Sequence, residues 1–114
     1  MAKEKEQTEP TEKIRAADVV LVVETSQGVK EYKGRLRTND SVEDFLSELR
    51  DTQDMYYERD LYTYGSVITQ VYGKEPALDN RWAVLSNGEE ITNKIANVYL
   101  TDHAVYTLKE LPNK

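Results

Sequence analysis

The order of apolar and polar positions along the chain predicts two strands first. Residues 19–23 form a continuous run of valine and leucine, which is typical of a strand buried on both faces. Residues 29–37 alternate instead, with Tyr32 and Leu36 on one side and charged residues on the other, as in an edge strand. Residues 25–28 between them have the composition of a turn, so the two runs are predicted to form a hairpin.

A single amphipathic helix is predicted after the hairpin. Ser41 and Asp44 have the spacing of a capping box, in which each side chain bonds the backbone of the other residue. Apolar residues then recur at the spacing of one helical face, at Val42, Phe45, Leu46 and Leu49. We expect this helix to end near Gln53.

The second half of the chain predicts further strands. Residues 67–72 and 81–86 are strand-like, and the second run ends at Asn87-Gly88, the strongest short hairpin pattern. We expect 81–86 to pair antiparallel with a strand beginning at 89–91, with Leu85 facing the helix. Residues 55–64 fit a short strand or an irregular arm, and 103–108 are predicted to form the last strand.

This order predicts an α+β fold of the β-grasp type, a ubiquitin-like roll in which one helix packs across a small mixed sheet. The first and last strands are expected to be adjacent and parallel. Residues 1–16 alternate lysine and glutamate with almost no apolar residue, and we interpret them as a disordered N-terminal tether. Residues 17–111 are long enough for one domain with one core.

Charge and cysteine content narrow the function classes. The 114 residues carry a net charge of −6, which argues against nucleic-acid binding. Residues 39–60 alone hold eight acids and two arginines, so the acidity is local to the predicted helix and the segment after it. The chain has no cysteine, which excludes disulfides, thiolate metal sites and a cysteine nucleophile.

Neither a catalytic nor a metal site is predicted. His103 is the only histidine, no G-x-S-x-G sequence accompanies it, and a residue at the edge of a turn is the simpler interpretation. The acids of 51–60 lack the spacing and the central glycine of a calcium-binding EF-hand loop. We therefore expect a protein that is not an enzyme and has no cofactor or metal.

Aromatic residues are the candidates for a binding site. Rings with a polar tip suit stacking on sugars or flat ligands and also suit protein interfaces. The alternative is that these rings belong to the core or cover the helix, which is the expectation for Trp82 and Tyr72 in particular. The candidate ligand or interface residues are Tyr56, Tyr57, Tyr62, Tyr64, Tyr72 and Trp82.

These segments resemble a known family. The matching patterns are Ser41-Val42-x-Asp44-x-Leu46, Tyr64-Gly65-x-x-Ile68-x-x-Val71-x-Gly73, Trp82-x-x-x-x-Asn87-Gly88 and Val98-x-Leu100-x-Asp102-x-x-x-Tyr106. Together they resemble the transcobalamin-like C-terminal domain family over roughly residues 18–110. The resemblance implies a β-grasp domain of the kind found in vertebrate cobalamin carriers and in bacterial surface proteins and lipoproteins.

Two functional hypotheses follow. The first is a non-enzymatic binding or interaction module of an exported bacterial protein, tethered to the cell surface, with its signal sequence removed and a lipid anchor upstream. The second is a small-ligand carrier that stacks a cobalamin-like tetrapyrrole or a sugar on exposed aromatic rings. Both imply a protein or small-molecule partner, and no apolar stretch approaches the ~20 residues of a membrane span.

Overall fold

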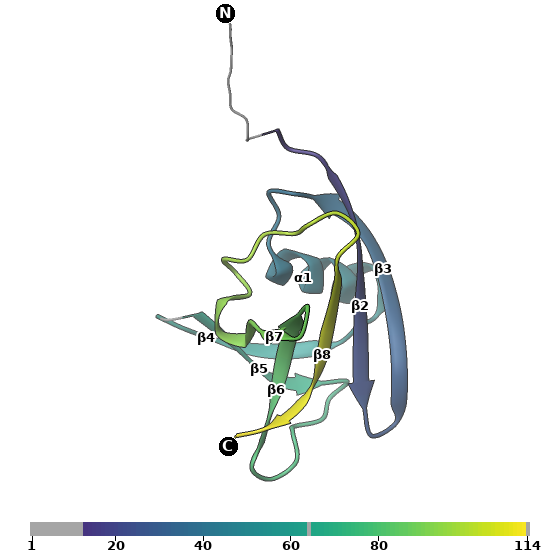
Figure 1. The fold of residues 1–114 in the computed structure, drawn as a ribbon. Helices are drawn as coiled ribbons and strands as arrows, with labels where there is room; N and C mark the ends of the chain where they lie inside the picture. Colours follow the sequence, from purple (N-terminus) through teal and green to yellow (C-terminus); the bar gives the residue numbers. More distant parts are fainter. Residues whose placement is uncertain (1–12, 64, 114) are drawn as a thin grey trace, which may run out of the picture.

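The computed structural model describes residues 13–63 and 65–113, so most of the predicted tether and Tyr64 lie outside the described residues. The chain is an α+β domain with one helix among these residues (Figure 1). Its elements are β2 (Ala16–Thr25), β3 (Gly28–Arg37), α1 (Val42–Gln53), β4 (Tyr57–Tyr62), β5 (Gly65–Val71), β6 (Asn80–Ser86), β7 (Glu89–Glu90), the 3-10 turn η1 (Thr92–Lys94) and β8 (Val105–Pro112).

The main sheet has five strands in the order β3-β2-β8-β6-β7. Strand β2 is antiparallel to β3 and parallel to β8, which confirms that the first and last strands are neighbours. Strands β4 and β5 form a separate antiparallel pair, so the segment left open between a strand and an irregular arm contains a strand.

The helix begins as its sequence predicts. The Ser41 side chain accepts a hydrogen bond from the Asp44 amide at 3.1 Å, and the Asp44 carboxylate accepts one from the Ser41 amide at 2.8 Å. Both bonds satisfy amides that a helix start leaves without partners. The four apolar residues of the predicted face are fully buried, and they are Val42, Phe45, Leu46 and Leu49.

The core lies between two layers. Alternate residues of β2 (Val19, Leu21 and Val23) point toward α1, and the β4–β5 pair packs on the same side of the sheet. In Figure 1 both α1 and β5 lie behind the main sheet. On the opposite face, Val20 and Val22 of β2 are half-buried and Lys33 and Arg35 of β3 are exposed, so no described element packs over this part of the sheet.

Gly34 lets β3 and the helix approach closely. A Cβ atom at this position would lie 2.6 Å from Cε1 of Phe45, well inside van der Waals contact. Phe45 in turn packs edge-on against Tyr106, with ring centroids 6.4 Å apart. The glycine therefore makes room for the helix's largest core side chain.

Three details differ from expectation. Val20 and Val22 are half-buried, because only one face of β2 is covered. Trp82 and Val84 face the core and Leu85 faces outward, so the helix-facing assignment of Leu85 was wrong. The last strand, β8, begins two residues later than expected and continues to Pro112, beyond its expected end at residue 108.

Candidate functional site

Two of the candidate aromatic residues belong to the core. Trp82 is 3% exposed, and its indole nitrogen donates a hydrogen bond to the Lys74 carbonyl at 3.1 Å. Tyr57 is 2% exposed, and its hydroxyl lies 3.3 Å from the Ser47 hydroxyl. Neither ring presents a face on which a ligand could stack, which agrees with the core interpretation of Trp82.

Tyr72 is half-buried at the rim of a hollow of about 530 Å³, here named the tyrosine hollow. Its hydroxyl lies 2.5 Å from the Tyr32 hydroxyl, and the Lys30 ammonium lies 5.7 Å from the centre of its ring. Burial, with the Tyr32 hydrogen bond, raises the pKa of Tyr72. The hollow is lined by Val23, Thr25, Gln27, Gly28, Val29, Lys30, Tyr72 and Lys74.

The other two described aromatic candidates, Tyr56 and Tyr62, are exposed. The Tyr56 hydroxyl donates to the Asp54 carboxylate at 3.0 Å, and this bond raises the pKa of Tyr56. Tyr62 ends β4 and is half exposed, while Tyr64 lies outside the described residues. The five described aromatic candidates therefore do not form one stacking surface.

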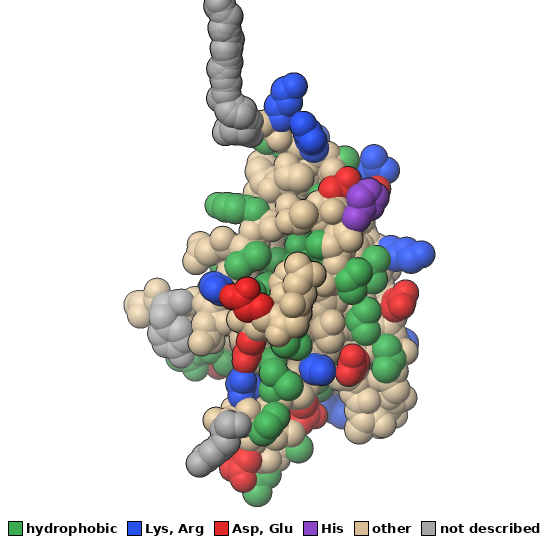
Figure 2. All heavy atoms as spheres, viewed as in Figure 1, with side chains coloured by type: hydrophobic (Ala, Val, Ile, Leu, Met, Phe, Trp, Pro, Cys, Tyr) green, Lys and Arg blue, Asp and Glu red, His purple; other side chains and the backbone are tan. Residues whose placement is uncertain are grey.

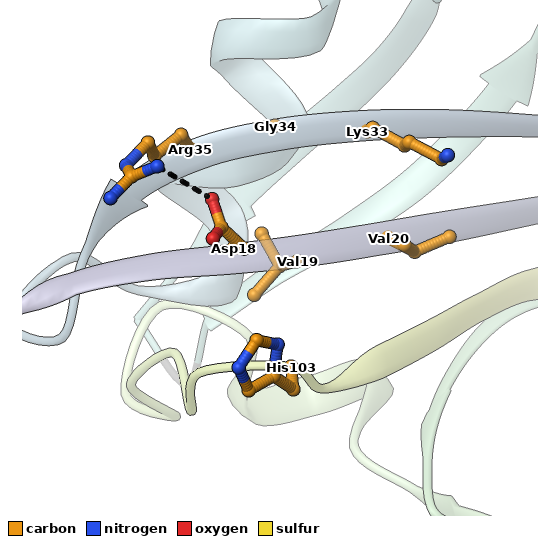
Figure 3. A pocket seen from close by; sticks show the side chains of 7 residues that line it. All are labelled: Asp18, Val19, Val20, Lys33, Gly34, Arg35 and His103. Atoms are coloured by element: carbon orange, nitrogen blue, oxygen red, sulfur yellow. Dashed lines mark ion pairs between the residues drawn. The ribbon is translucent and has the colours of Figure 1, made fainter.

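A second hollow lies on the face of the sheet that the helix leaves uncovered, and Figure 3 shows it. Its volume is about 470 Å³. It is lined by Asp18, Val19, Val20, Lys33, Gly34, Arg35 and His103, and is here named the basic hollow. Figure 2 shows the outer face of the sheet, where hydrophobic side chains gather among charged ones with the histidine nearby.

The strand register brings the cations of β3 to this hollow. Antiparallel pairing sets Arg35 opposite Asp18 and Lys33 opposite Val20. Side chains alternate along a strand, and Gly34 faces the helix, so its two basic neighbours face outward.

The turn before β8 is hydrogen-bonded to β2, and this places His103 at the hollow. The His103 amide donates to the Asp18 carbonyl at 2.7 Å, and the Val20 amide donates to the Ala104 carbonyl at 3.1 Å. His103 has a φ of 69°, in the left-handed region that sharp turns use. The Asp102 carboxylate accepts from the Asp18 amide at 2.8 Å and completes the attachment.

The charges of the hollow are weakly paired. Arg35 lies 3.6 Å from Asp18, with both side chains at least half exposed, and His103 Nε2 lies 3.4 Å from the Asp102 carboxylate. Exposed ion pairs contribute little stability, so an incoming anion can replace these partners at small cost. Lys33 adds an ammonium group, and Val20 supplies apolar surface. This arrangement suits an anionic group on a partner that also has apolar contacts.

Sequence reasoning did not predict this site. It assigned Lys33 and Arg35 to the charged side of an edge strand and His103 to the edge of a turn. The missing step was to combine the predicted hairpin and the predicted parallel contact of the first and last strands with a strand register, which the hairpin prediction left unassigned. Together these place residue 103 beside residue 18, opposite Arg35.

Within the described residues, no three acidic or histidine side chains are grouped to hold a metal ion. No helix among those residues is long and apolar enough to cross a membrane. These two findings concern residues 13–63 and 65–113.

Comparison with known proteins shows the fold. No protein-family model and no curated protein matches this chain. The structure is similar to haptocorrin crystallised in complex with Cbi, with a TM-score of 0.78 at 12% identity over 88% of this chain. The match spans 26% of the haptocorrin chain, about a quarter of its length.

A second similar structure is a candidate metal-binding protein from Ruminococcus gnavus ATCC 29149. Its TM-score is 0.62 at 15% identity, and the match covers 86% of this chain and 99% of that one. At these identities the likeness shows a shared fold. The chain therefore has a transcobalamin-like fold.

Proposed function

We propose that this chain is a non-enzymatic binding module whose basic hollow holds an anionic group of a partner. The observation that carries the proposal is that Lys33, Arg35 and His103 line one open hollow together with the apolar side chain of Val20. Guanidinium and ammonium groups are the common protein partners of carboxylates and phosphates. The hollow is shallow and open, which suits a group presented by a larger molecule.

The wider setting of the module is also a proposal. We propose a β-grasp arrangement in residues 17–111, a tether in residues 1–16, and export to a bacterial cell surface. The support is the resemblance to transcobalamin-like domains and the alternation of lysine and glutamate near the start. A gene with neither a signal peptide nor a lipobox upstream of residue 1 would contradict export.

Binding of a short polyglutamate tests the anion site. We expect saturable binding by calorimetry that weakens at least about tenfold in a Lys33→Gln, Arg35→Gln double variant, because two charge-assisted contacts are removed. The matched control is Lys94→Gln on η1, an exposed lysine away from the hollow. Equal loss in the control, or equal binding of polylysine, would overturn the proposal.

The tyrosine hollow supports a second candidate function, a carrier for a small ring-containing ligand. Tyr72 contributes a half-buried ring beside two lysines, and a similar structure, haptocorrin, was crystallised with Cbi. Cobalamin, haem and oligosaccharides are the compounds to titrate. Trp82 fluorescence is a suitable readout, because its indole donates to the backbone of Lys74 in the hollow wall. No saturable change at millimolar ligand would remove this candidate.

A further inference from the structure

Strand β3 forms an open edge of the main sheet. It is ten residues long and stands at one end of the strand order, and in the described part of the chain it pairs with β2 alone. An unpaired edge exposes a row of backbone N–H and C=O groups that can pair with another strand. Such strand addition is a common way for a domain to bind an extended peptide.

Two side-chain contacts identify the backbone groups that point outward. The Gln53 amide at the end of α1 donates to the Lys33 carbonyl at 2.8 Å, and the Arg37 amide donates to the Asp40 carboxylate at 3.0 Å. In an antiparallel pair, alternate residues direct their backbone groups away from the partner strand. The backbone N–H and C=O groups therefore point away from β2 at residues 31, 33, 35 and 37. The Gln53 side-chain amide occupies the position that the N–H of an added strand would take at the Lys33 carbonyl.

The outward-pointing residues also set the charge of this edge. Their side chains lie on the uncovered face, beside the basic hollow, and they are Glu31, Lys33, Arg35 and Arg37. Three of the four are cations. Two β3 edges paired antiparallel about Lys33 would oppose the two lysines and gain attraction only between Glu31 and Arg35, whereas an acidic strand can face all three cations. The edge is therefore matched to an acidic partner better than to a second copy of this chain.

We propose that the partner is an acidic, extended peptide segment that adds antiparallel to β3 as a further strand. This inference rests on the proposed function, since the peptide's carboxylates are the anionic groups held by Lys33 and Arg35. Directly opposite residues share a face, so acids at alternate positions meet Arg35 and then Lys33. A basic residue two positions further along meets Glu31. The expected pattern is acid-x-acid-x-base.

Three acetylated and amidated peptides test this inference. The first has the core Glu-Val-Glu-Val-Lys, the second is its charge reversal Lys-Val-Lys-Val-Glu, and the third is the first with N-methyl groups on both glutamates. N-methylation keeps every charge but removes two backbone donors. We expect the first to bind and the other two to bind at least about tenfold more weakly. These changes are in the peptide, so they leave the fold of the protein untouched.

A Gln53→Ala variant supplies a test in the opposite direction. Because the Gln53 amide competes for the Lys33 carbonyl, its removal is expected to tighten peptide binding about two- to tenfold, the range for one hydrogen bond. Thr52→Ala is the matched control, since the Thr52 hydroxyl donates to the Glu48 carbonyl within the same helix. Slower hydrogen exchange at the Lys33 and Arg35 amides in the complex would report the new strand directly.

The outcomes separate the two proposals. If polyglutamate binds while the N-methylated peptide binds as well as its parent, strand addition is wrong and the anion site stands. If neither polyglutamate nor the acidic peptide binds, both proposals fail. Unchanged affinity in Gln53→Ala, with no exchange protection along β3, would also overturn strand addition.

Discussion

Trp82 was a candidate for ligand binding, but its burial assigns it a structural role in the core. Its ring is 3% exposed in the core, and its N–H is satisfied by the Lys74 carbonyl. We expect Trp82→Ala to lower the free energy of unfolding by about 3–5 kcal/mol, as for other large core truncations. Urea denaturation measures this, and Trp82→Phe, which retains most of the apolar area, should cost less. An unchanged melting temperature in Trp82→Ala would refute the core assignment.

Gly34 is required for side-chain packing, not for an unusual backbone conformation. A methyl group there would collide with Phe45, whose side chain is fully buried. We expect Gly34→Ala to cost about 1–3 kcal/mol, the usual range for overpacking. A double-mutant cycle with Phe45→Leu checks the cause, because removing the ring should relieve the collision. The double variant should then lose less than the sum of the two single losses.

At the scale of elements, local patterns predicted most of the fold. The helix, its capping box and the Asn87-Gly88 turn are set by residues close in sequence, and both turn residues have positive φ. The face of β6 was wrongly assigned because alternation defines two faces without saying which one is covered. The uncovered face of β2 was missed for the same reason, since a run of valines also fits a strand with one open side.

The basic hollow could not be predicted from local patterns. It needs the register of one strand pair and the neighbour relation of another, and these bring residues 18, 33, 35 and 103 together. The aromatic residues were more conspicuous in the sequence than the residues of the basic hollow, but Trp82 is buried in the core. The type of side chain therefore indicated which residues could bind a ligand. Their burial in the structure showed which of them are accessible to one.

Strands β6 and β7 and turn η1 are joined by a charged network that predicts a pH dependence. The Arg81 guanidinium donates to the Glu90 carboxylate, which also accepts from the Thr92 hydroxyl at 2.6 Å. The Arg81 hydrogen bond, with help from Thr92, lowers the pKa of Glu90. A lowered folded-state pKa gives stability that is present above the unfolded value of about 4.3 and is lost as the pH falls through the folded value.

We therefore expect Glu90→Gln to be less stable than the parent at pH 7, by a small amount because both partners are about one-third exposed. The difference should shrink as the pH is lowered below about 4.3. Melting temperatures from pH 7 to pH 3 measure it. Glu89→Gln is the control, because the Glu89 side chain is 74% exposed and lies 3.8 Å from the Lys94 ammonium, a loose ion pair. A difference that grows on acidification would contradict this account.

At the scale of the whole molecule, charge is divided between the two layers. The acidic segment of residues 39–60 includes the helix, whereas the cations of β3 lie on the sheet face opposite the helix. The proposed acidic ligand would therefore approach a protein of net charge −6 but dock beside the cations of β3. Long-range charge mainly affects association rates, whereas contacts in the interface mainly affect dissociation rates.

This division predicts that two sets of substitutions act on different rates. Glu48→Gln with Asp51→Asn, both on the exposed side of α1, should speed association of the acidic peptide about twofold and leave dissociation unchanged. The gain should disappear in 1 M salt, where charges are screened beyond about 3 Å. Lys33→Gln with Arg35→Gln should instead speed dissociation, because these side chains contact the ligand. Stopped-flow measurements at low and high salt resolve both rates, and a changed dissociation rate in the α1 variant would mean that the ligand also contacts the helix.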